Sequence, residues 1–290
     1  MRRTVVRVTS GASDRLRTDR WLRLDGTTNT RDLGGLPTTD GGTTTFGRVL
    51  RSDNLQTLSD ADIATLVDEL GLTDVVDLRT TAEILMEGRG PLRAVAAVTH
   101  RHFTLLPERG LRTDVFAAEE DDAELGGDLP ADWAESLMPR AVAAGDEAEP
   151  PAVRSYLGYL ADGTDNVLAA LRALAAAPGA AVVHCAAGKD RTGMIAMFAL
   201  EVAGVEREAI IADYALTAEV IDALVAKLAA SPTYAEDMTT RGVDVHTPRA
   251  ETMRRVLELL EERHGGPLGW LTEHGFGPEE QAALRARLRE

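Results

Sequence analysis

The chain has 290 residues, of which 44% are hydrophobic, and its 31 Lys and Arg against 47 Asp and Glu give a net charge of −16. This length and apolar content suffice for a sizeable globular core, whereas the negative balance disfavours nucleic acid and anionic membrane surfaces as partners. The sequence contains no run of 18 apolar residues, so it predicts no membrane-spanning helix. The single cysteine excludes a disulfide within the chain.

The first residues are basic and show no clear periodicity. Met1-Arg2-Arg3 is followed by a stretch that is too short and too charged for the apolar core of a signal peptide. We therefore expect a flexible tail over residues 1–20 and a cytoplasmic protein. A lone cysteine also suits a reducing compartment.

Short strands alternate with helices in the first part of the expected domain. Ser59 and Asp62 form a capping box that opens a helix ending at Gly71, and Thr80 and Glu83 form another that opens a short helix. The remaining expected elements are an ordered start at Trp21 to Gly35, a turn or hairpin at Thr38 to Gly47, and strands at Thr73 to Leu78 and Val98 to Leu105.

The middle of the chain differs in composition from its surroundings. Residues 119–149 contain 11 acidic residues and one basic residue, Arg140, and two prolines follow. Such a segment has little to bury, so we interpret it as part of an insertion at about 110–150 within a single domain spanning 21–290.

The second half is largely helical around one more strand. Apolar spacing predicts helices at Ala152 to Leu160 and Asn166 to Ala177, at Glu206 to Ala230 (as one or two helices), at Pro248 to Arg263 and from Pro278 onward, with a strand at Ala180 to His184. The alternation predicts an α/β fold in which a small, mainly parallel sheet is flanked by helices.

The stretch from His184 to Gly193 (HCAAGKDRTG) carries the clearest chemical signal. Cys185 follows a short apolar strand, Arg191 comes six positions later, and a helix-forming run begins there. A thiol attacks phosphorus only as a thiolate, which helix N-termini and nearby cations favour. We therefore predict a phosphate-binding catalytic loop at the carboxyl end of this strand.

Each residue type in this loop suits an anion. The backbone amides from Ala186 to Arg191 can form a concave nest, which the positive-φ freedom of Gly188 allows. The guanidinium of Arg191 matches two phosphate oxygens. Thr192 is expected to donate its hydroxyl to the sulfur, and His184 to hold a backbone carbonyl beneath the loop.

Other readings of the loop fit less well. A nucleotide-binding loop requires glycine where Val183 stands and serine or threonine where Asp190 stands. One cysteine cannot supply the paired thiolates of a zinc site, so no metal is expected. A rhodanese-like sulfur-transfer loop is one residue shorter, and no feature places the partner histidine of a cysteine protease.

The loop resembles that of the bacterial tyrosine/serine protein phosphatases of the protein-tyrosine-phosphatase B type. Segments elsewhere also resemble this family, and together they run from about residue 21 to the end. They are Asn29-Thr30-Arg31-Asp32-Leu33-Gly34-Gly35, Arg48-Val49-Leu50-Arg51-Ser52-Asp53, Asp74-Val75-Val76-Asp77-Leu78-Arg79, Ile211-Ala212-Asp213-Tyr214 and Gly265-Gly266-Pro267-Leu268-Gly269-Trp270-Leu271.

This resemblance implies a tyrosine-phosphatase-like fold and a metal-independent phosphatase without a cofactor. Cys185 would be the nucleophile of a cysteinyl-phosphate intermediate, and the phosphate would be held by Arg191 with Ala186, Ala187, Gly188, Lys189 and Thr192. Substrates would be proteins phosphorylated on tyrosine, and also on serine or threonine. The cation of Lys189 would favour a second phosphate, as in phosphoinositides.

The resemblance leaves several points open. The general acid is Asp190, inside the loop, or alternatively Glu108. The acidic insertion is either a helical lid over the cleft, as in related phosphatases, or a solvated loop. Some relatives are exported without a conventional signal, so export stays open, as does the oligomeric state. A silent phosphate-recognition module is the alternative function, and sulfur transfer or arsenate reduction is a weaker one.

Overall fold

A five-stranded sheet forms the centre of the computed structural model, which describes residues 20–106, 148–240 and 242–290. The strand order is β1-β2-β5-β3-β4, and only β1 runs antiparallel to its neighbour. This arrangement confirms the predicted α/β fold with a mainly parallel sheet. The strands are β1 (Arg31–Asp32), β2 (Val49–Ser52), β3 (Leu72–Asp77), β4 (Thr99–His102) and β5 (Ala180–His184).

Successive residues of the central strand β5 serve two different cores. Val182 packs with Val75 in one hydrophobic cluster, whereas Val183 packs with Val76 in the other. Neighbouring side chains of a strand point to opposite faces of the sheet, so apolar residues at consecutive positions are what a strand covered on both sides requires. All five residues of β5 are buried.

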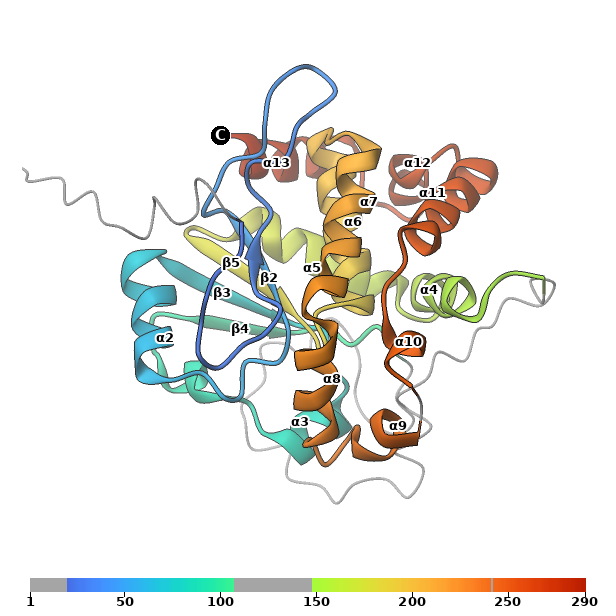
Figure 1. Ribbon diagram of the computed structural model, residues 1–290. Coiled ribbons are helices and arrows are strands. Elements are labelled where there is room, and N and C mark those ends of the chain that lie inside the picture. The colour runs from blue at the N-terminus through green and yellow to red at the C-terminus, as the bar shows by residue number, and fades with distance from the viewer. Residues whose placement is uncertain (1–19, 107–147, 241) are drawn as a thin grey trace, which may run out of the picture.

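Helices cover both faces of the sheet. The larger core lies under the helices α4 to α7 and α11 to α13, and α2 with the π-helical turn Thr65–Glu69 covers the opposite face (Figure 1). The bounds are α2 (Asp60–Ala64), α4 (Pro151–Asp162), α5 (Thr164–Ala176), α6 (Asp190–Ala203), α7 (Arg207–Ala215), α11 (Ala250–His264), α12 (Pro267–Glu273) and α13 (Pro278–Arg289).

Four further helices gather near the carboxyl end of the parallel strands. They are α3 (Thr81–Glu87), α8 (Ile221–Ala229), α9 (Ala235–Thr240) and α10 (Val243–His246), and Figure 1 shows them grouped below α6. In open α/β sheets this end of the strands is where ligands bind. These helices therefore stand where they can wall a site.

The structure confirms both predicted capping boxes, at Ser59 and at Thr80. The helix after Ser59 is α-helical only to Ala64 and continues as a π-helical turn before Gly71 reverses the chain at φ 68°. The strand predicted at Val98 to Leu105 is confined to β4. The segment Glu206 to Ala230 forms α7 and α8 joined by a 3-10 turn, Leu216–Val220.

Two predicted regions fall largely outside the described residues. They are the tail over residues 1–20, of which only Arg20 is described, and most of the insertion at about 110–150. Within the described part, no helix has the length and apolar character needed to cross a bilayer.

Candidate active site

The predicted loop joins β5 to α6 and turns sharply between them. β5 ends at His184 and α6 begins at Asp190, so residues 185–189 form the connection. Gly188 adopts φ 64°, and a Cβ atom there would lie 2.4 Å from the carbonyl oxygen of Ser52. Both the left-handed backbone and this close approach to β2 require glycine.

Donors from outside the loop bind its carbonyl groups. The amide of Asn54 donates to the carbonyl of Ala186 at 3.0 Å. Asn29 Nδ2 donates to the carbonyls of Ala187 and Gly188 at 2.9 and 3.2 Å, and Arg51 Nη2 donates to that of Gly188 at 2.8 Å. Within the described residues, the loop amides from residue 186 to 189 have no acceptor. Unpaired amides in such a turn form the nest expected for an anion.

Cys185 lies at the start of this nest, is buried, and is a free thiol. Beneath it, His184 Nδ1 donates to the carbonyl of Cys185 at 3.3 Å, as the sequence predicted. Burial lowers the pKa of His184 to about 4, although the carboxylate of Asp77 lies 3.6 Å away. The ring is therefore neutral at physiological pH and carries its proton on Nδ1.

The hydroxyl of Thr192 does not make the predicted hydrogen bond to the sulfur. It is buried without a hydrogen-bond partner among the described residues. Thr192 is the third residue of α6 and is buried.

Arg191 is fixed by a carboxylate that the sequence analysis did not connect with the loop. Its Nη1 and Nη2 bind the two oxygens of Glu83 at 2.6 and 2.9 Å, and Nη1 also donates to the carbonyl of Leu78. The hydroxyl of Tyr234 contacts both Glu83 and Arg191. Burial alone would lower the pKa of Arg191, but the Glu83 carboxylate outweighs it and holds that pKa above its ordinary value.

The two loop residues before Arg191 both have partners. Lys189 Nζ donates to the carbonyl of His246 at 2.7 Å and lies 3.5 Å from Asp190 Oδ2. Asp190 Oδ1 accepts a hydrogen bond of 2.6 Å from the hydroxyl of Tyr156. The alternative acid, Glu108, lies outside the described residues.

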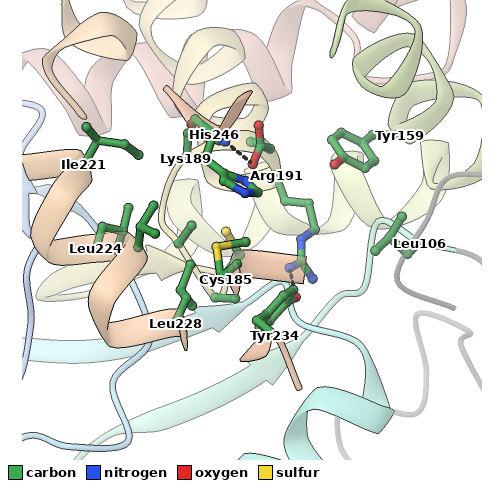
Figure 2. Close-up of a pocket in the computed structure, with 15 residues that line it drawn as sticks. Leu106, Tyr159, Cys185, Lys189, Arg191, Ile221, Leu224, Leu228, Tyr234 and His246 are labelled. Atoms are coloured by element: carbon green, nitrogen blue, oxygen red, sulfur yellow. Dashed lines mark hydrogen bonds and ion pairs between the residues drawn. The ribbon is translucent and has the colours of Figure 1, made fainter. Parts of the chain in front are cut away.

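The loop lines a pocket of about 150 Å³ (Figure 2). One wall is the loop itself, with Cys185, Lys189, Asp190 and Arg191. Figure 2 shows the opposing apolar wall, which α8 supplies, and the guanidinium of Arg191 extending toward Tyr234. The apolar side chains of α8 in the pocket are Ile221, Leu224, Val225 and Leu228.

Beneath the loop, two buried arginines share one aspartate. Arg31 Nε and Arg51 Nη1 bind Asp213 at 3.2 and 2.6 Å, and Arg20 binds the same carboxylate at 2.7 Å. Burial and the neighbouring Arg51 lower the pKa of Arg31 to about 9, so it is still charged at neutral pH. Positive charge therefore exceeds negative charge in this cluster, below an anion-binding loop.

Two aspartates from the segments that resemble the family, Asp77 and Asp32, stabilise the framework around the loop. Asp77 forms an ion pair with Arg79 at 2.6 Å. Asp32 accepts hydrogen bonds from the amides of Gly34 and Gly47. Its neighbour Arg31 forms an ion pair with Asp213 instead. Among the described residues, no group of three His, Cys, Asp or Glu side chains is placed to hold a metal ion.

Comparison with known proteins identifies the family. The model of the tyrosine phosphatase family matches residues 22–290. The chain is 29% identical to the triple specificity protein phosphatase PtpB of Mycobacterium tuberculosis over 253 residues, which cover 79% of this chain and 86% of that protein. It is also 31% identical over 122 residues to a tyrosine-protein phosphatase of Nostoc commune, covering 38% of this chain and 39% of that one. The chain therefore belongs to the tyrosine phosphatase family and is a phosphatase.

Proposed function

We propose that the chain hydrolyses phosphate monoesters through a cysteinyl-phosphate intermediate on Cys185. The observation that carries this proposal is the orientation of the loop. Its carbonyls are bound from outside by Asn54, Asn29 and Arg51, and the amides of residues 186–189, which follow Cys185, have no acceptor among the described residues. Amides fixed before the substrate arrives stabilise a transferring phosphoryl group without reorganisation.

The reaction would proceed in two displacements. The sulfur of Cys185 attacks phosphorus, the bond from phosphorus to the ester oxygen breaks, and Asp190 gives its proton to the departing oxygen. Water then attacks the phosphocysteine, the sulfur–phosphorus bond breaks, and Asp190 takes a proton from the water. Throughout, the loop amides and Arg191 hold the three non-bridging oxygens.

Asp190 is the better supported of the two candidate acids. It lines the same pocket as Cys185, and its Oδ2 is not engaged by Tyr156. It is also the first residue of α6, so its backbone position is fixed relative to the nucleophile. Positioned proton transfer of this kind contributes about 10²–10⁴-fold to a rate.

The pocket suits phosphotyrosine best. The apolar side chains of α8 stand opposite the loop, where the ring of a phosphotyrosine would contact them. Lys189 adds a second cation, which would serve a second phosphate in a phosphoinositide. The similarity to a relative named for triple specificity supports a broader range that includes phosphoserine and phosphothreonine. We rank tyrosine first and the other classes second.

We also propose that residues 21–290 form one phosphatase domain that contains the acidic insertion at about 110–150. The family match over residues 22–290 spans that insertion and supports this division. Residues 1–20 would then be a tail outside the domain.

The test is hydrolysis of p-nitrophenyl phosphate and of a phosphotyrosine peptide in the presence of EDTA. Wild type is expected to turn over both substrates, and Cys185→Ser to lose turnover while it still binds phosphate. Arg191→Lys keeps the charge but lacks the planar fork, so its phosphate affinity is expected to fall. Undiminished turnover by Cys185→Ser would overturn the proposal.

The same assays separate the alternative functions. A silent recognition module would bind the phosphopeptide without releasing phosphate. Sulfur transfer or arsenate reduction would not depend on a phosphate ester, and the chain offers no second cysteine to resolve such an intermediate.

A further inference from the structure

Three side chains from separate elements form a chain of short hydrogen bonds that ends at the active-site pocket. Tyr156 of α4 donates to Oδ1 of Asp190 at 2.6 Å. The hydroxyls of Tyr156 and of Tyr214, from α7, also lie 2.6 Å apart. Both tyrosines are buried in the larger core, with 1% and 3% of their surfaces exposed.

The direction of this chain follows from proton counting. Tyr156 gives its one proton to Oδ1 of Asp190, which can accept it whether or not the carboxyl group carries a proton on Oδ2. Tyr214 must then donate to the oxygen of Tyr156. Burial and the nearby Asp190 raise the pKa of both tyrosines above the ordinary value, so both hydroxyls keep their protons at physiological pH.

Local packing makes room for this arrangement. The rings of Tyr156 and Tyr214 meet edge to face, with centroids 6.1 Å apart and planes at 83°. Gly193, in the first turn of α6, faces the ring of Tyr214, and a Cβ atom there would lie 3.2 Å from it. A larger residue at this position would crowd the ring of Tyr214.

The consequence concerns the two oxygens of Asp190. Tyr156 engages Oδ1, whereas Oδ2 faces Lys189 at 3.5 Å, and the side chain is 31% exposed where it lines the pocket. A carboxyl group held by one oxygen cannot rotate freely. It therefore presents the same oxygen to the substrate each time.

We propose that Tyr156, supported by Tyr214, is a positioning residue that aims Oδ2 of Asp190 at the leaving oxygen of the substrate. This inference rests on the proposed role of Asp190 as the general acid. A hydroxyl buried in the core thus controls proton transfer at the pocket without touching the substrate. Removing this hydroxyl by Tyr156→Phe would leave the nucleophile and the phosphate-binding amides in place.

The experiment compares substrates that differ in their need for an acid. Phenyl phosphate has a poor leaving group and depends on protonation, whereas p-nitrophenyl phosphate has a good one and depends on it far less. The quantity to compare is kcat/KM, which reports the first displacement and not the later hydrolysis of the phosphocysteine. Tyr156→Phe is expected to lower kcat/KM on phenyl phosphate by about tenfold or more, with little change on p-nitrophenyl phosphate. Tyr214→Phe should show the same selectivity with a smaller loss.

Two controls distinguish positioning from a structural role. Ile210→Val removes one methylene from the buried side of α7 and costs about 0.5–1.5 kcal/mol of stability. Any loss of kcat/KM in this variant should therefore be the same on both substrates. In an Asp190→Asn background, Tyr156→Phe should cause no further loss, because the two residues act through one function.

Three outcomes would overturn the proposal. Equal losses of kcat/KM on both substrates in Tyr156→Phe would indicate a structural role, and an unchanged kcat/KM on both would indicate that Tyr156 has no role. If Asp190→Asn lowered kcat/KM by the same factor on both substrates, a residue other than Asp190 would be the acid. In each case a covalent phosphoenzyme on Cys185 would show that the proposed function itself survives.

Discussion

Arg191 and Glu83 form a buried, two-point ion pair across 108 residues of sequence, with N–O distances of 2.6 and 2.9 Å. The carboxylate is itself fixed, because Oε2 of Glu83 also accepts the amide of Thr80 in the capping box of α3. A helix cap thereby orients the arginine that we propose as the phosphate clamp. The guanidinium is held in place before a substrate arrives.

Glu83→Gln is expected to impair both folding and catalysis. The variant leaves the buried guanidinium of Arg191 without its counterion, which should lower the free energy of unfolding by about 3–5 kcal/mol. A displaced clamp should lower kcat/KM by about 10²-fold. Denaturant unfolding and steady-state kinetics measure the two effects. Glu69→Gln, which removes an exposed carboxylate, is the control, and a Glu83→Gln enzyme with the same kcat/KM as this control would contradict the assignment.

Gly188→Ala is expected to disable the loop through both backbone strain and contact. The added Cβ would lie 2.4 Å from the carbonyl oxygen of Ser52, and the alanine would have to adopt φ 64°. Gly71→Ala provides the matched control, because it requires φ 68° but has no atom within 4 Å of its added Cβ. Both variants should lose about 1–2 kcal/mol from strain. Only Gly188→Ala should also lose phosphate affinity, measured as the inhibition constant of inorganic phosphate, and equal inhibition constants would argue against the close packing.

The pKa of His184 predicts a specific pH dependence of stability. The unfolded chain protonates this ring below about pH 6.5, but the folded chain does so only below about pH 4, because the ring is buried. The unfolded state thus binds more protons between these values, and stability falls as the pH drops through that window. The total loss from this group is about 3 kcal/mol.

His184→Asn keeps a donor for the carbonyl of Cys185 but cannot titrate. As the pH falls from 7 to 4, the free energy of unfolding of wild type should therefore drop by about 3 kcal/mol more than that of the variant. A difference that stays constant over this range would show that the ring titrates normally in the folded protein.

The loop was predictable because its chemistry is contiguous. Cys185, Gly188 and Arg191 lie within seven residues, and the strand before them and the helix after them follow from apolar spacing. Their relative placement is therefore set by a short stretch of chain. For the same reason the mainly parallel sheet was predictable, since its strands are short apolar runs between helices.

The residues that support the loop were not predictable, because only the fold brings them together. Asn29 reaches Gly188 across 159 residues and Tyr156 reaches Asp190 across 34. Glu83 was identified in the sequence as a capping residue, a role that it does fill, and nothing in its spacing indicated a second contact with Arg191. The short helices α9 and α10 have too few residues to show helical periodicity.

The most direct test of the account is to trap the intermediate. The enzyme is mixed with p-nitrophenyl phosphate and quenched in acid within the first turnovers. It is then digested, and the masses of the peptides are measured by mass spectrometry. We predict one phosphoryl group on the peptide that contains Cys185, and none on that peptide from Cys185→Ser. A wild-type enzyme that turns over rapidly while this cysteine never carries phosphate would contradict the account.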